Sequence, residues 1–414
     1  WKDGNFPYFQ MAMGKTSRRI DTELALRRYI DDINDIYLDS YENSWRIIQR
    51  DNEDNRRPLS HDYFESLCEE DTDTGCMSLN LQGNKNSVPP RHRLVEDDLH
   101  LVFESVVRME VEALDLSYSR IGDTGAVTIG EYLGSKSVPL RYLNLMGSGI
   151  GPDGAKGLFS QIHSTSKLEA IKMAVNEIGD QGGFAAAKFI LRSNNLRSID
   201  LGDCGIENQG ILRILYALGR KSEVVSINLK HPRTLSTECE DKEALVNAIQ
   251  SMETLDSLFV GNWGIDDLHV QLLSQAVLRG GSLTLLDLTC NRISEEGAQA
   301  IANLIKNHDK LQHLNLDGNA LGDNGAWHIS EALSQNTPLK SVDLRRNGIR
   351  GHGLMILAEG LIYNFTLERC YLWGNVFEEC AREEFSRLQN LGLLDNLQMD
   401  IIMYQVDGKP QLCQ

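Results

Sequence analysis

The chain has 414 residues with 41% hydrophobic content, a mean hydropathy of -0.30 and a formal net charge of -18. Because no apolar run approaches the roughly 18 residues that a membrane span needs, the sequence predicts a soluble protein with no membrane partner. The negative charge argues against nucleic acid as a direct partner, since phosphate binding depends on Lys and Arg, and favours a basic or neutral protein surface instead. The chain starts at Trp1 without the apolar core of a signal peptide, so we expect the natural N-terminus to lie upstream.

Eight cysteines are scattered along the chain without CxxC spacing. Cys204, Cys290 and Cys370 fall in or beside predicted strands, where they would serve as small packing residues. We therefore expect reduced thiols in an intracellular protein, with neither a disulfide nor a metal site.

Residues 1–76 precede the repeated part of the chain and predict a helical extension. Between about Asp21 and Arg50, apolar residues step by three or four, which indicates one stripe of a long helix: Leu26, Ile30, Ile33, Tyr37, Tyr41, Trp45 and Ile48. This helix either caps the first repeat or clamps another protein, and in the second case Tyr37 and Trp45 are candidate partner-binding residues. The 17 acidic and 10 basic residues of 1–76 argue against a nucleic-acid arm. A second, short helix is expected to begin after Ser60.

A repeated unit fills residues 77–391. In LDLTCNRISEEGAQAIANLIKNHDKLQHLNL, residues 286–316, a short strand, a turn and an amphipathic helix lead to the next strand 28 residues later. The frame recurs in eleven strand openings, at Leu79, Leu114, Leu143, Ile171, Ile199, Ile227, Leu258, Leu286, Leu314, Val342 and Cys370. This period lies within the range of leucine-rich repeats. Since one unit cannot bury its own apolar side chains, we predict an α/β leucine-rich-repeat solenoid, a horseshoe with a parallel sheet on its concave face and helices on its convex face.

Two kinds of residue recur at fixed offsets from the strand openings. Asn stands five residues after six of the openings, where a buried amide can bond backbone groups of adjacent repeats: Asn84, Asn176, Asn291, Asn319, Asn347 and Asn375. Because Ser, Cys, Pro or Trp stands there in the other repeats, we expect the amide ladder to be interrupted. Gly recurs just before the helix, where either small size or a permissive backbone helps the chain turn.

Two segments depart from the frame. In the sixth repeat, the charged sequence KHPRTLSTECEDKEALVNAI, with Pro232 at the Asn position, predicts a longer loop that is either a tolerated insertion or a partner contact. After the last helix, Ile402, Tyr404 and Val406 alternate before a DG turn, which is a hairpin signal within residues 392–414. We expect this hairpin to cap the open edge of the final repeat.

Side chains one and three residues after each strand opening point away from the core, onto the concave face. At the first of these two positions most are Asp or Asn, which we interpret as solvating an exposed sheet. Aromatic and basic side chains are harder to explain in this way, because such residues dominate protein interfaces. The candidate partner-binding residues on this face are Phe259, Trp263, Arg345, Arg346, Tyr371 and Trp373. Packing beneath the C-terminal cap is the alternative for Tyr371 and Trp373.

No catalytic constellation survives comparison with the repeat. The sequence GSGIGPDG at 147–154 is similar to a phosphate loop, but its glycines occupy the repeat's own turn positions and no Walker lysine follows. The histidines have no partners at metal-ligand spacing. The sequence therefore predicts a protein that is not an enzyme, without a cofactor, metal or small-molecule substrate.

The frame LxLxxNxI followed by a Gly-led helix resembles the ribonuclease-inhibitor type of leucine-rich repeat over about residues 77–391. That resemblance implies a protein-binding scaffold, and the superfamily includes nuclease inhibitors and GTPase activators. The sequences INLKHPRTLSTECE, YLWGNVFEE and VDGKPQL together resemble a narrower family, that of leucine-rich repeat-containing protein 34.

The narrower resemblance implies two possible settings. The family is linked to ciliary and sperm-tail axonemes and, separately, to nucleolar regulation in stem and germ cells. We therefore expect a structural component of a multi-subunit axonemal complex, such as a radial spoke, located in the cilium or flagellum. The alternatives are a nuclear or nucleolar adaptor that regulates gene expression, and an inhibitor or GTPase activator. The absence of a strongly acidic tail argues against the activator.

Overall fold

The computed structural model describes residues 59–72, 74–83, 94–135, 138–220, 223–233, 240–335, 338–406 and 408–413. Contacts divide the chain into two compact units, Trp1–Ile206 and Glu207–Gln414. The division falls inside the segment 77–391 that the sequence predicts as one solenoid. Each unit repeats the same strand, turn and helix.

The first unit contains one sheet whose strand order follows the chain. Its described strands are β1 (Cys68–Glu70), β2 (Met77–Asn80), β3 (Ala113–Asp115), β4 (Tyr142–Asn144), β5 (Ala170–Lys172) and β6 (Ser198–Asp200). Its described helices are α3 (His61–Glu65), the 3-10 turn η3 (Glu96–Asp98), α4 (Leu99–Arg108), α5 (Gly122–Ser135), α6 (Pro152–Gln161) and α7 (Gly179–Arg192).

The second unit continues the alternation of strand and helix. Its described strands are β7 (Ser226–Asn228), β8 (Ser257–Phe259), β9 (Leu285–Asp287), β10 (His313–Asn315), β11 (Ser341–Asp343), β12 (Arg369–Tyr371), β13 (Gln398–Met399), β14 (Ile402–Val406) and β15 (Lys409–Cys413). Its described helices are α8 (Asn208–Leu218), α9 (Glu240–Ser251), α10 (Asp267–Gly280), α11 (Glu295–Asn307), α12 (Gly322–Leu333), α13 (Gly351–Ile362) and α14 (Glu379–Asn390).

The strands pair in the register that the sequence frame predicts. In the first unit Leu79, Leu114, Leu143, Ile171 and Ile199 lie opposite one another on consecutive parallel strands. In the second unit the same holds for Ile227, Leu258, Leu286, Leu314, Val342 and Cys370. The predicted solenoid of strand and helix repeats is therefore confirmed in each unit.

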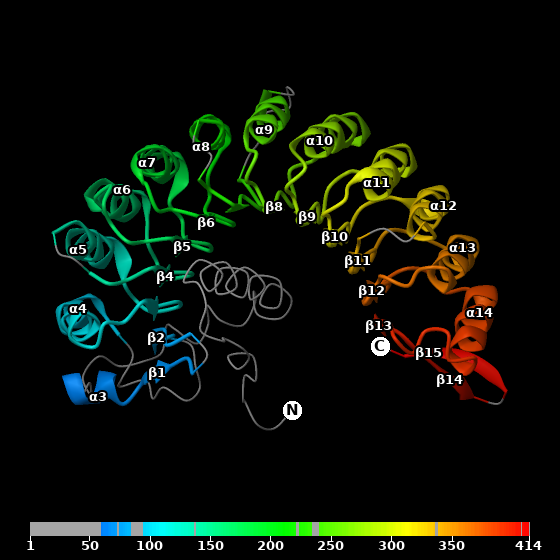
Figure 1. Ribbon diagram of the computed structural model, residues 1–414, viewed down its shortest axis with the longest axis horizontal. Coiled ribbons are helices and arrows are strands. Elements are labelled where there is room, and N and C mark those ends of the chain that lie inside the picture. The colour runs from blue at the N-terminus through cyan, green and yellow to red at the C-terminus, as the bar shows by residue number, and fades with distance from the viewer. Residues whose placement is uncertain are drawn as a thin grey trace. The chain divides into compact units, whose positions relative to one another are not determined.

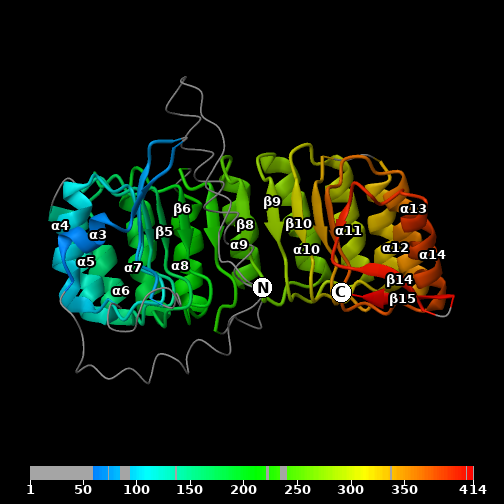
Figure 2. The same cartoon turned by 90° about the horizontal axis from the view of Figure 1, so that it is seen from below.

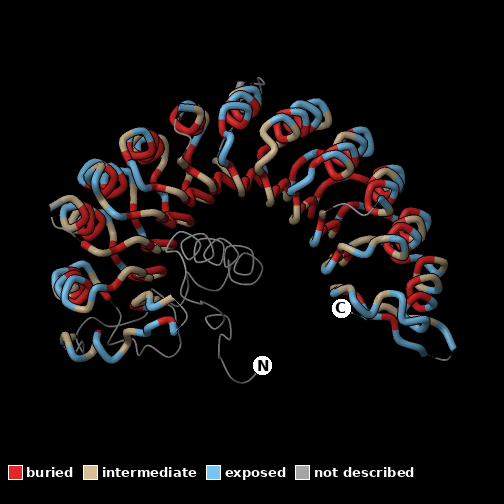
Figure 3. The backbone as a smooth tube through the Cα atoms, viewed as in Figure 1, coloured by how far each residue is buried: buried red, intermediate tan, exposed pale blue. Residues whose placement is uncertain are grey.

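Within each unit the helices cover one face of the sheet, as Figure 1 shows. Residues at the strand openings point toward the helices and are buried, together with the inward stripe of each helix, so the core is a continuous layer between sheet and helices (Figure 3). Leu286, for example, is 1% exposed and Ile301 of α11 is 0% exposed. Burying a Leu or Ile side chain contributes about 1.5–3 kcal/mol, and only stacked repeats achieve it. The opposite face of the sheet is called the strand face below.

A seam of side-chain hydrogen bonds joins successive repeats at the predicted Asn position. Asn291 shows the pattern: its Nδ2 donates to the carbonyls of Val260 (3.1 Å) and Leu288 (2.9 Å), and its Oδ1 accepts from the backbone N–H groups of Trp263 and Ile265 (both 3.0 Å). Bonds of the same kind are made by Asn176, Asn319, Asn347 and Asn375. The amide ladder is confirmed for these five residues, and Asn84 lies outside the described residues.

The expected interruption of the ladder is wrong at four positions. Each of the replacing side chains carries its own donor and bonds the same carbonyl of the preceding repeat: Ser119 bonds Leu81, Ser148 bonds Leu116, Cys204 bonds Met173 and Trp263 bonds Leu229. The chemistry differs, but the backbone partner is the same. Pro232 has neither a side-chain donor nor an N–H, so it cannot take this role. We use "the seam" for these nine donors.

The recurring glycines serve through small size. Gly154, Gly297 and Gly353 lie in the first turn of their helices, inside the helix and not before it as the sequence suggested. A Cβ on Gly297 would lie 2.4 Å from Oδ1 of Asp267, the carboxylate that accepts the N–H groups of Ser294 (2.7 Å) and Gly297 (3.0 Å). A carboxylate of one repeat therefore caps the helix of the next, and only glycine leaves room for it.

A left-handed residue recurs four positions after every strand opening from Leu114 to Cys370. Glycine stands there as Gly147, Gly318 and Gly374, but the other repeats place L-residues in the same conformation: Tyr118, Val175, Asp203, His231, Asn262, Cys290 and Arg346. Val175 has φ 62°, an unfavourable value for a β-branched side chain. The turn geometry is therefore imposed by the repeat and not by the local sequence.

At the described ends of the sheet, the predicted helix after Ser60 and the predicted hairpin are confirmed, and the strands β1 and β13 are additions that were not predicted. At the N-terminal side, Ser60 caps α3 by accepting the N–H of Tyr63 (3.2 Å), and β1 adds an antiparallel strand beside β2. At the C-terminal side, β13 pairs with β12, while β14 and β15 form an antiparallel hairpin in the segment where one was expected. The hairpin lies against α14 (Figure 2), because Gln389 of that helix bonds the N–H and C=O of Met403.

Candidate functional site

Most acidic and amide side chains of the strand face have a backbone role. Eight of them, among the described residues, accept the N–H group two residues later in an Asx turn: Asn80, Asp115, Asn144, Asp200, Asn228, Asp287, Asn315 and Asp343. These bonds fix the bend at the end of each strand. The predicted role of these residues, solvation of an exposed sheet, therefore misses their structural role.

Tyr371 cannot accept the Asx-turn hydrogen bond, and another residue supplies the acceptor. It occupies the Asx-turn position, but its side chain is no substitute for a carboxylate. Asp400 supplies the missing acceptor: its Oδ1 accepts the N–H of Leu372 (2.7 Å) and its Oδ2 that of Trp373 (3.1 Å). Asp400 lies outside the repeat frame, so no sequence pattern pointed to this role. The aromatic residue at 371 is thus accommodated by a carboxylate from another segment.

Arg345 and Arg346 follow β11, and each pairs with a carboxylate of the strand face. Nε of Arg345 lies 3.0 Å from both carboxylate oxygens of Asp343, and Nε of Arg346 lies 2.9 Å from Oδ1 of Asp317. Asp317 and Asp343 are 2% and 6% exposed, so each guanidinium neutralises a buried charge. The Arg345 side chain is partly buried, whereas that of Arg346 is 58% exposed.

The electrostatics of the two pairs favour fixed, charged guanidinium groups. Burial lowers the pKa of Arg345, but its hydrogen bonds to Asp343 and the charge of that carboxylate outweigh burial and raise it above the ordinary value. The hydrogen bond to Asp317 raises the pKa of Arg346. Burial raises the pKa of Asp343, and Arg345 opposes that shift. The two arginines therefore stay ionised and hold their guanidinium groups in fixed orientations at one place on the strand face.

The aromatic residues lie beside this pair. Tyr371 is opposite Asp343 in the strand register, and the guanidinium carbon of Arg345 lies 5.4 Å from its ring centroid. The backbone carbonyl of Trp373 accepts the N–H of Arg346 (3.0 Å). Both aromatic residues are partly exposed. The structure thus brings together Arg345, Arg346, Tyr371 and Trp373, which we name the C-terminal strand-face cluster.

Phe259 and Trp263 require a correction. Phe259 is 0% exposed, with Nζ of Lys230 lying 5.6 Å from its ring centroid and 2.7 Å from Oδ2 of Asp287. Trp263 is 1% exposed, because its ring takes the seam position and Nε1 donates to Leu229 (2.8 Å). The expected exposed aromatic patch is therefore absent at these two residues, since both rings are interior.

The remaining predicted contacts lie elsewhere in the chain. Tyr37 and Trp45 fall outside the described residues, and so do residues 234–239 of the sixth-repeat loop. Among the described cysteines, all seven are free thiols. Cys204 and Cys370 are buried as expected, but Cys290 is exposed because it occupies the left-handed position after β9.

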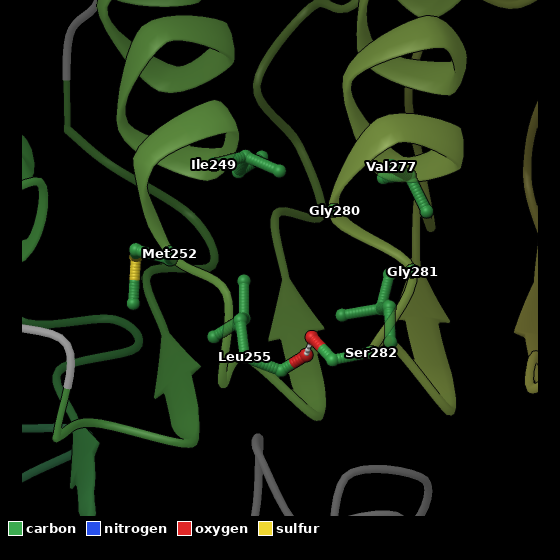
Figure 4. A pocket seen from close by; sticks show the side chains of 8 residues that line it. Ile249, Met252, Leu255, Val277, Gly280, Gly281 and Ser282 are labelled. Atoms are coloured by element: carbon green, nitrogen blue, oxygen red, sulfur yellow. Dashed lines mark hydrogen bonds between the residues drawn. The ribbon is translucent and has the colours of Figure 1, made fainter.

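The part of the chain that the structure describes holds no second kind of site by the criteria of metal binding and membrane insertion. There, no cluster of His, Cys, Asp and Glu could hold a metal ion. Within the same residues, no helix has the length and apolarity to cross a membrane. A cavity between α9 and α10, beside Gly280 and Gly281, has a volume of only about 10 Å³ (Figure 4). That is at the lower limit for one water molecule, so it is a packing gap closed by the bond from Ser282 Oγ to Leu255 (2.7 Å) and not a ligand site.

Comparison with known proteins agrees with the geometry. A family model described as a leucine-rich repeat matches residues 111–130, 136–159, 192–215, 282–302, 308–326 and 335–358. The mouse (Mus musculus) ribonuclease inhibitor is 24% identical over 207 residues, which cover 49% of this chain and 44% of that protein. The chain contains leucine-rich repeats, and they are similar to those of the ribonuclease inhibitor. Mouse leucine-rich repeat-containing protein 34 is 29% identical over 103 residues, 25% of this chain and 25% of that protein.

The matches cover no more than 44% of the length of these curated relatives. Among solved structures, the yeast Rad7 and Elc1 complex includes a similar chain, with 14% identity, a TM-score of 0.46 and coverage of 93% of this chain and 92% of that chain. Ribonuclease-inhibitor-type leucine-rich-repeat proteins are typically non-catalytic binding scaffolds, and this fold is suited to protein–protein interaction.

Proposed function

We propose that the chain is a non-enzymatic scaffold that holds other proteins together in an axonemal complex of the cilium or flagellum, such as a radial spoke or an associated complex. The observation that carries the binding role is the C-terminal strand-face cluster. The axonemal setting rests on the resemblance of INLKHPRTLSTECE, YLWGNVFEE and VDGKPQL to one family, to which the similarity with mouse leucine-rich repeat-containing protein 34 adds support.

The cluster has the properties of a protein-binding hot spot. Arg345 and Arg346 are held by Asp343 and Asp317, so little side-chain entropy is lost when a partner binds them. Tyr371 and Trp373 add apolar area with few rotatable bonds, next to a guanidinium group. Since the net charge of the chain is -18, the partner surface is a protein surface and not a nucleic-acid backbone.

The setting is tested by extracting axonemes from ciliated cells, first with detergent and then with high salt. Crosslinking mass spectrometry is then applied to the insoluble fraction that remains. We expect the chain to resist both steps and to form crosslinks near Tyr371 and Trp373. Complete release by mild detergent would contradict the axonemal role. Recovery in the nuclear fraction would replace it with the adaptor role in gene expression.

A second candidate function is inhibition of a ribonuclease, because relatives from mouse and pig (Sus scrofa) carry the name ribonuclease inhibitor. The similarity covers 44% and 42% of those proteins. Titration of the full chain into a pancreatic-type ribonuclease assay separates the candidates. The scaffold proposal expects unchanged ribonuclease activity at micromolar concentrations of the chain.

A further inference from the structure

The last two repeats carry exposed apolar side chains at positions that are polar elsewhere. The positions lie twenty-one and twenty-three residues after each strand opening, where the helix ends and the chain returns to the sheet. Tyr363 and Phe365 occupy them after α13, with 63% and 83% exposure, and Leu391 and Leu393 occupy them after α14, with 60% and 49% exposure. We name these four residues the rim row.

Comparison with the other repeats shows that the fold does not need apolar residues here. The equivalent pairs are Ser164 with Ser166, Arg192 with Asn194, Arg279 with Gly281, and Asn307 with Asp309. Repeats with these polar pairs form the same strand and helix in the same register. An apolar row that the fold can replace by serine, and that is exposed to water, indicates a binding surface.

The two pairs of the rim row follow neighbouring helices, since α13 and α14 are adjacent and in contact (Figure 1). Helices packed side by side lie about 8–10 Å apart. Along a partner helix, side chains seven residues apart are separated by about 10 Å. One apolar stripe with an i, i+7 spacing would therefore reach both pairs.

An open cavity lies beside the C-terminal half of α14, which is followed by Leu391 and Leu393 of the row. Its volume is about 250 Å³, and Leu394, Leu397, Phe385 and Ile402 contribute to its lining. Leu394 directly follows Leu393 of the row. A cavity of this size takes one large apolar side chain, which is how interface anchors bind.

The charge around the row selects the partner. Glu359 and Asp395 are exposed, and neither is ion-paired with any described residue. The basic side chains nearby, Lys340 and Arg387, are paired with Glu368 (3.7 Å) and Glu384 (2.6 Å). The C-terminal ends of α13 and α14 add partial negative charge to the same edge.

We propose that the rim row binds an amphipathic helix of another protein, whose apolar stripe meets the row and whose flanking Lys or Arg residues meet Glu359 and Asp395. A second copy of this chain is a poor occupant, because two chains of net charge -18 would bring the same carboxylates together. This surface is distinct from the C-terminal strand-face cluster, and it extends the scaffold role to a second binding partner.

The test uses the full chain and a phage-displayed library of amphipathic helical peptides with both basic and acidic flanks. We expect enriched peptides to carry an apolar i, i+7 stripe with Lys or Arg. The variant Tyr363→Ser/Phe365→Ser/Leu391→Ser/Leu393→Ser, which copies the third repeat, should bind them at least about tenfold more weakly. The double variant Glu359→Lys/Asp395→Lys should weaken basic peptides and strengthen acidic ones.

A matched control removes exposed apolar residues elsewhere in the second unit. Leu268→Ser/Trp327→Ser, whose side chains are 59% and 49% exposed on α10 and α12, should leave peptide affinity unchanged. Three results would overturn the proposal: no enrichment of basic amphipathic peptides, equal binding by the four-serine variant, or a wild-type dimer in sedimentation that the four-serine variant disperses. Circular dichroism of the four-serine variant shows whether its fold is intact.

Discussion

The seam and the C-terminal strand-face cluster both contain departures from the repeat sequence, but the departures differ in kind. In the seam, Ser119, Ser148, Cys204 and Trp263 replace Asn and still bond the same backbone carbonyl. At the strand face, Tyr371 replaces Asp or Asn and abandons the backbone bond, which Asp400 takes over. A departure that keeps the repeat's hydrogen bond is therefore structural, whereas one that gives it up leaves the side chain open to another role: Tyr371 is partly exposed, while Phe259 at the same strand position is buried.

The largest expected effect lies in the seam. Asn291→Ala removes two donors to the carbonyls of Val260 and Leu288 and leaves the N–H groups of Trp263 and Ile265 without an acceptor. Because each buried polar group left unpaired costs about 1–3 kcal/mol, we expect the free energy of unfolding in urea to fall by about 4 kcal/mol. Asn324→Ala, an exposed residue with one side-chain bond to Glu295, is the control and should change it by less than about 0.5 kcal/mol. Similar losses of unfolding free energy for both variants would show that the seam bonds contribute no more than an exposed bond does.

The pH dependence of stability tests a residue at the start of a strand and not the seam, because amides and hydroxyls do not titrate near neutrality. His313, at the start of β10, has its pKa lowered to about 4 by burial and by the charges of Arg369 and Lys340. Between about pH 6.5 and 4 the unfolded chain binds a proton that the folded chain does not. The free energy of unfolding therefore decreases as the pH is lowered through that window, by roughly 3 kcal/mol in all.

The difference between wild type and His313→Gln isolates this contribution. Gln cannot be protonated, so the variant should keep its stability through this window, and the unfolding free energies of the two chains should diverge by roughly 3 kcal/mol as the pH falls from about 6.5 to 4. Urea midpoints measured from pH 7 to 4 check the expectation. Parallel midpoints over that range would show that His313 does not supply the pH dependence.

A smaller effect tests the helix caps that join repeats. Gly297→Ala places a Cβ 2.4 Å from Oδ1 of Asp267, so we expect a loss of about 2 kcal/mol despite the better helix propensity of Ala. Gly280→Ala, in α10, has no atom within 4 Å of the new Cβ and should be neutral or stabilising. A double-mutant cycle with Asp267→Ala should show coupling between 267 and 297. Additive effects would contradict the proposed clash.

Trp263 tests whether a side-chain donor other than Asn stabilises the seam. Trp263→Phe keeps most of the buried ring volume but removes the N–H that donates to Leu229 (2.8 Å). We expect a loss of about 1–2 kcal/mol in thermal or urea unfolding. An unchanged midpoint would mean that ring packing alone explains the residue, and that Trp263 is not a seam donor in energetic terms.

The smallest effect concerns the left-handed turn residues. Val175→Gly relieves a β-branched side chain at φ 62°, while Gly147, Gly318 and Gly374 already occupy this position in other repeats. We expect the free energy of unfolding to rise by about 1 kcal/mol, with the gain reduced by the greater freedom of glycine in the unfolded chain. A loss of stability would show that the Val175 side chain contributes more through its contacts than its backbone strain costs.

The period of 28 residues was enough to predict strand register, helix placement and the buried amides, because each rests on local spacing. The aromatic and basic cluster was predicted for the same reason: Arg345 and Trp373 lie three residues after adjacent strand openings, and Tyr371 lies one residue after the second, all at strand-face positions. Spacing could not show burial on that face, so Phe259 was assigned to a partner surface, although it is 0% exposed.

Other features depend on contacts that spacing does not encode. Asp400 lies after the last repeat helix, and only the folded chain brings it to the end of β12. The role of Trp263 could have been recognised from its seam position and its indole N–H, but aromatic residues are usually read as packing or interface groups. The short strands β1 and β13 pair with the outermost repeats and carry no repeat signature.

The most direct test of the account uses Tyr371→Asn/Trp373→Thr, which places at both positions residues found in equivalent places of other repeats, such as Asn315 and Thr289. Stability and axonemal retention are measured on the same variant. The account predicts an unfolding midpoint within about 0.5 kcal/mol of wild type, together with loss of retention after high-salt extraction of axonemes. Full retention by a stably folded variant would contradict the assignment of partner binding to the C-terminal strand-face cluster.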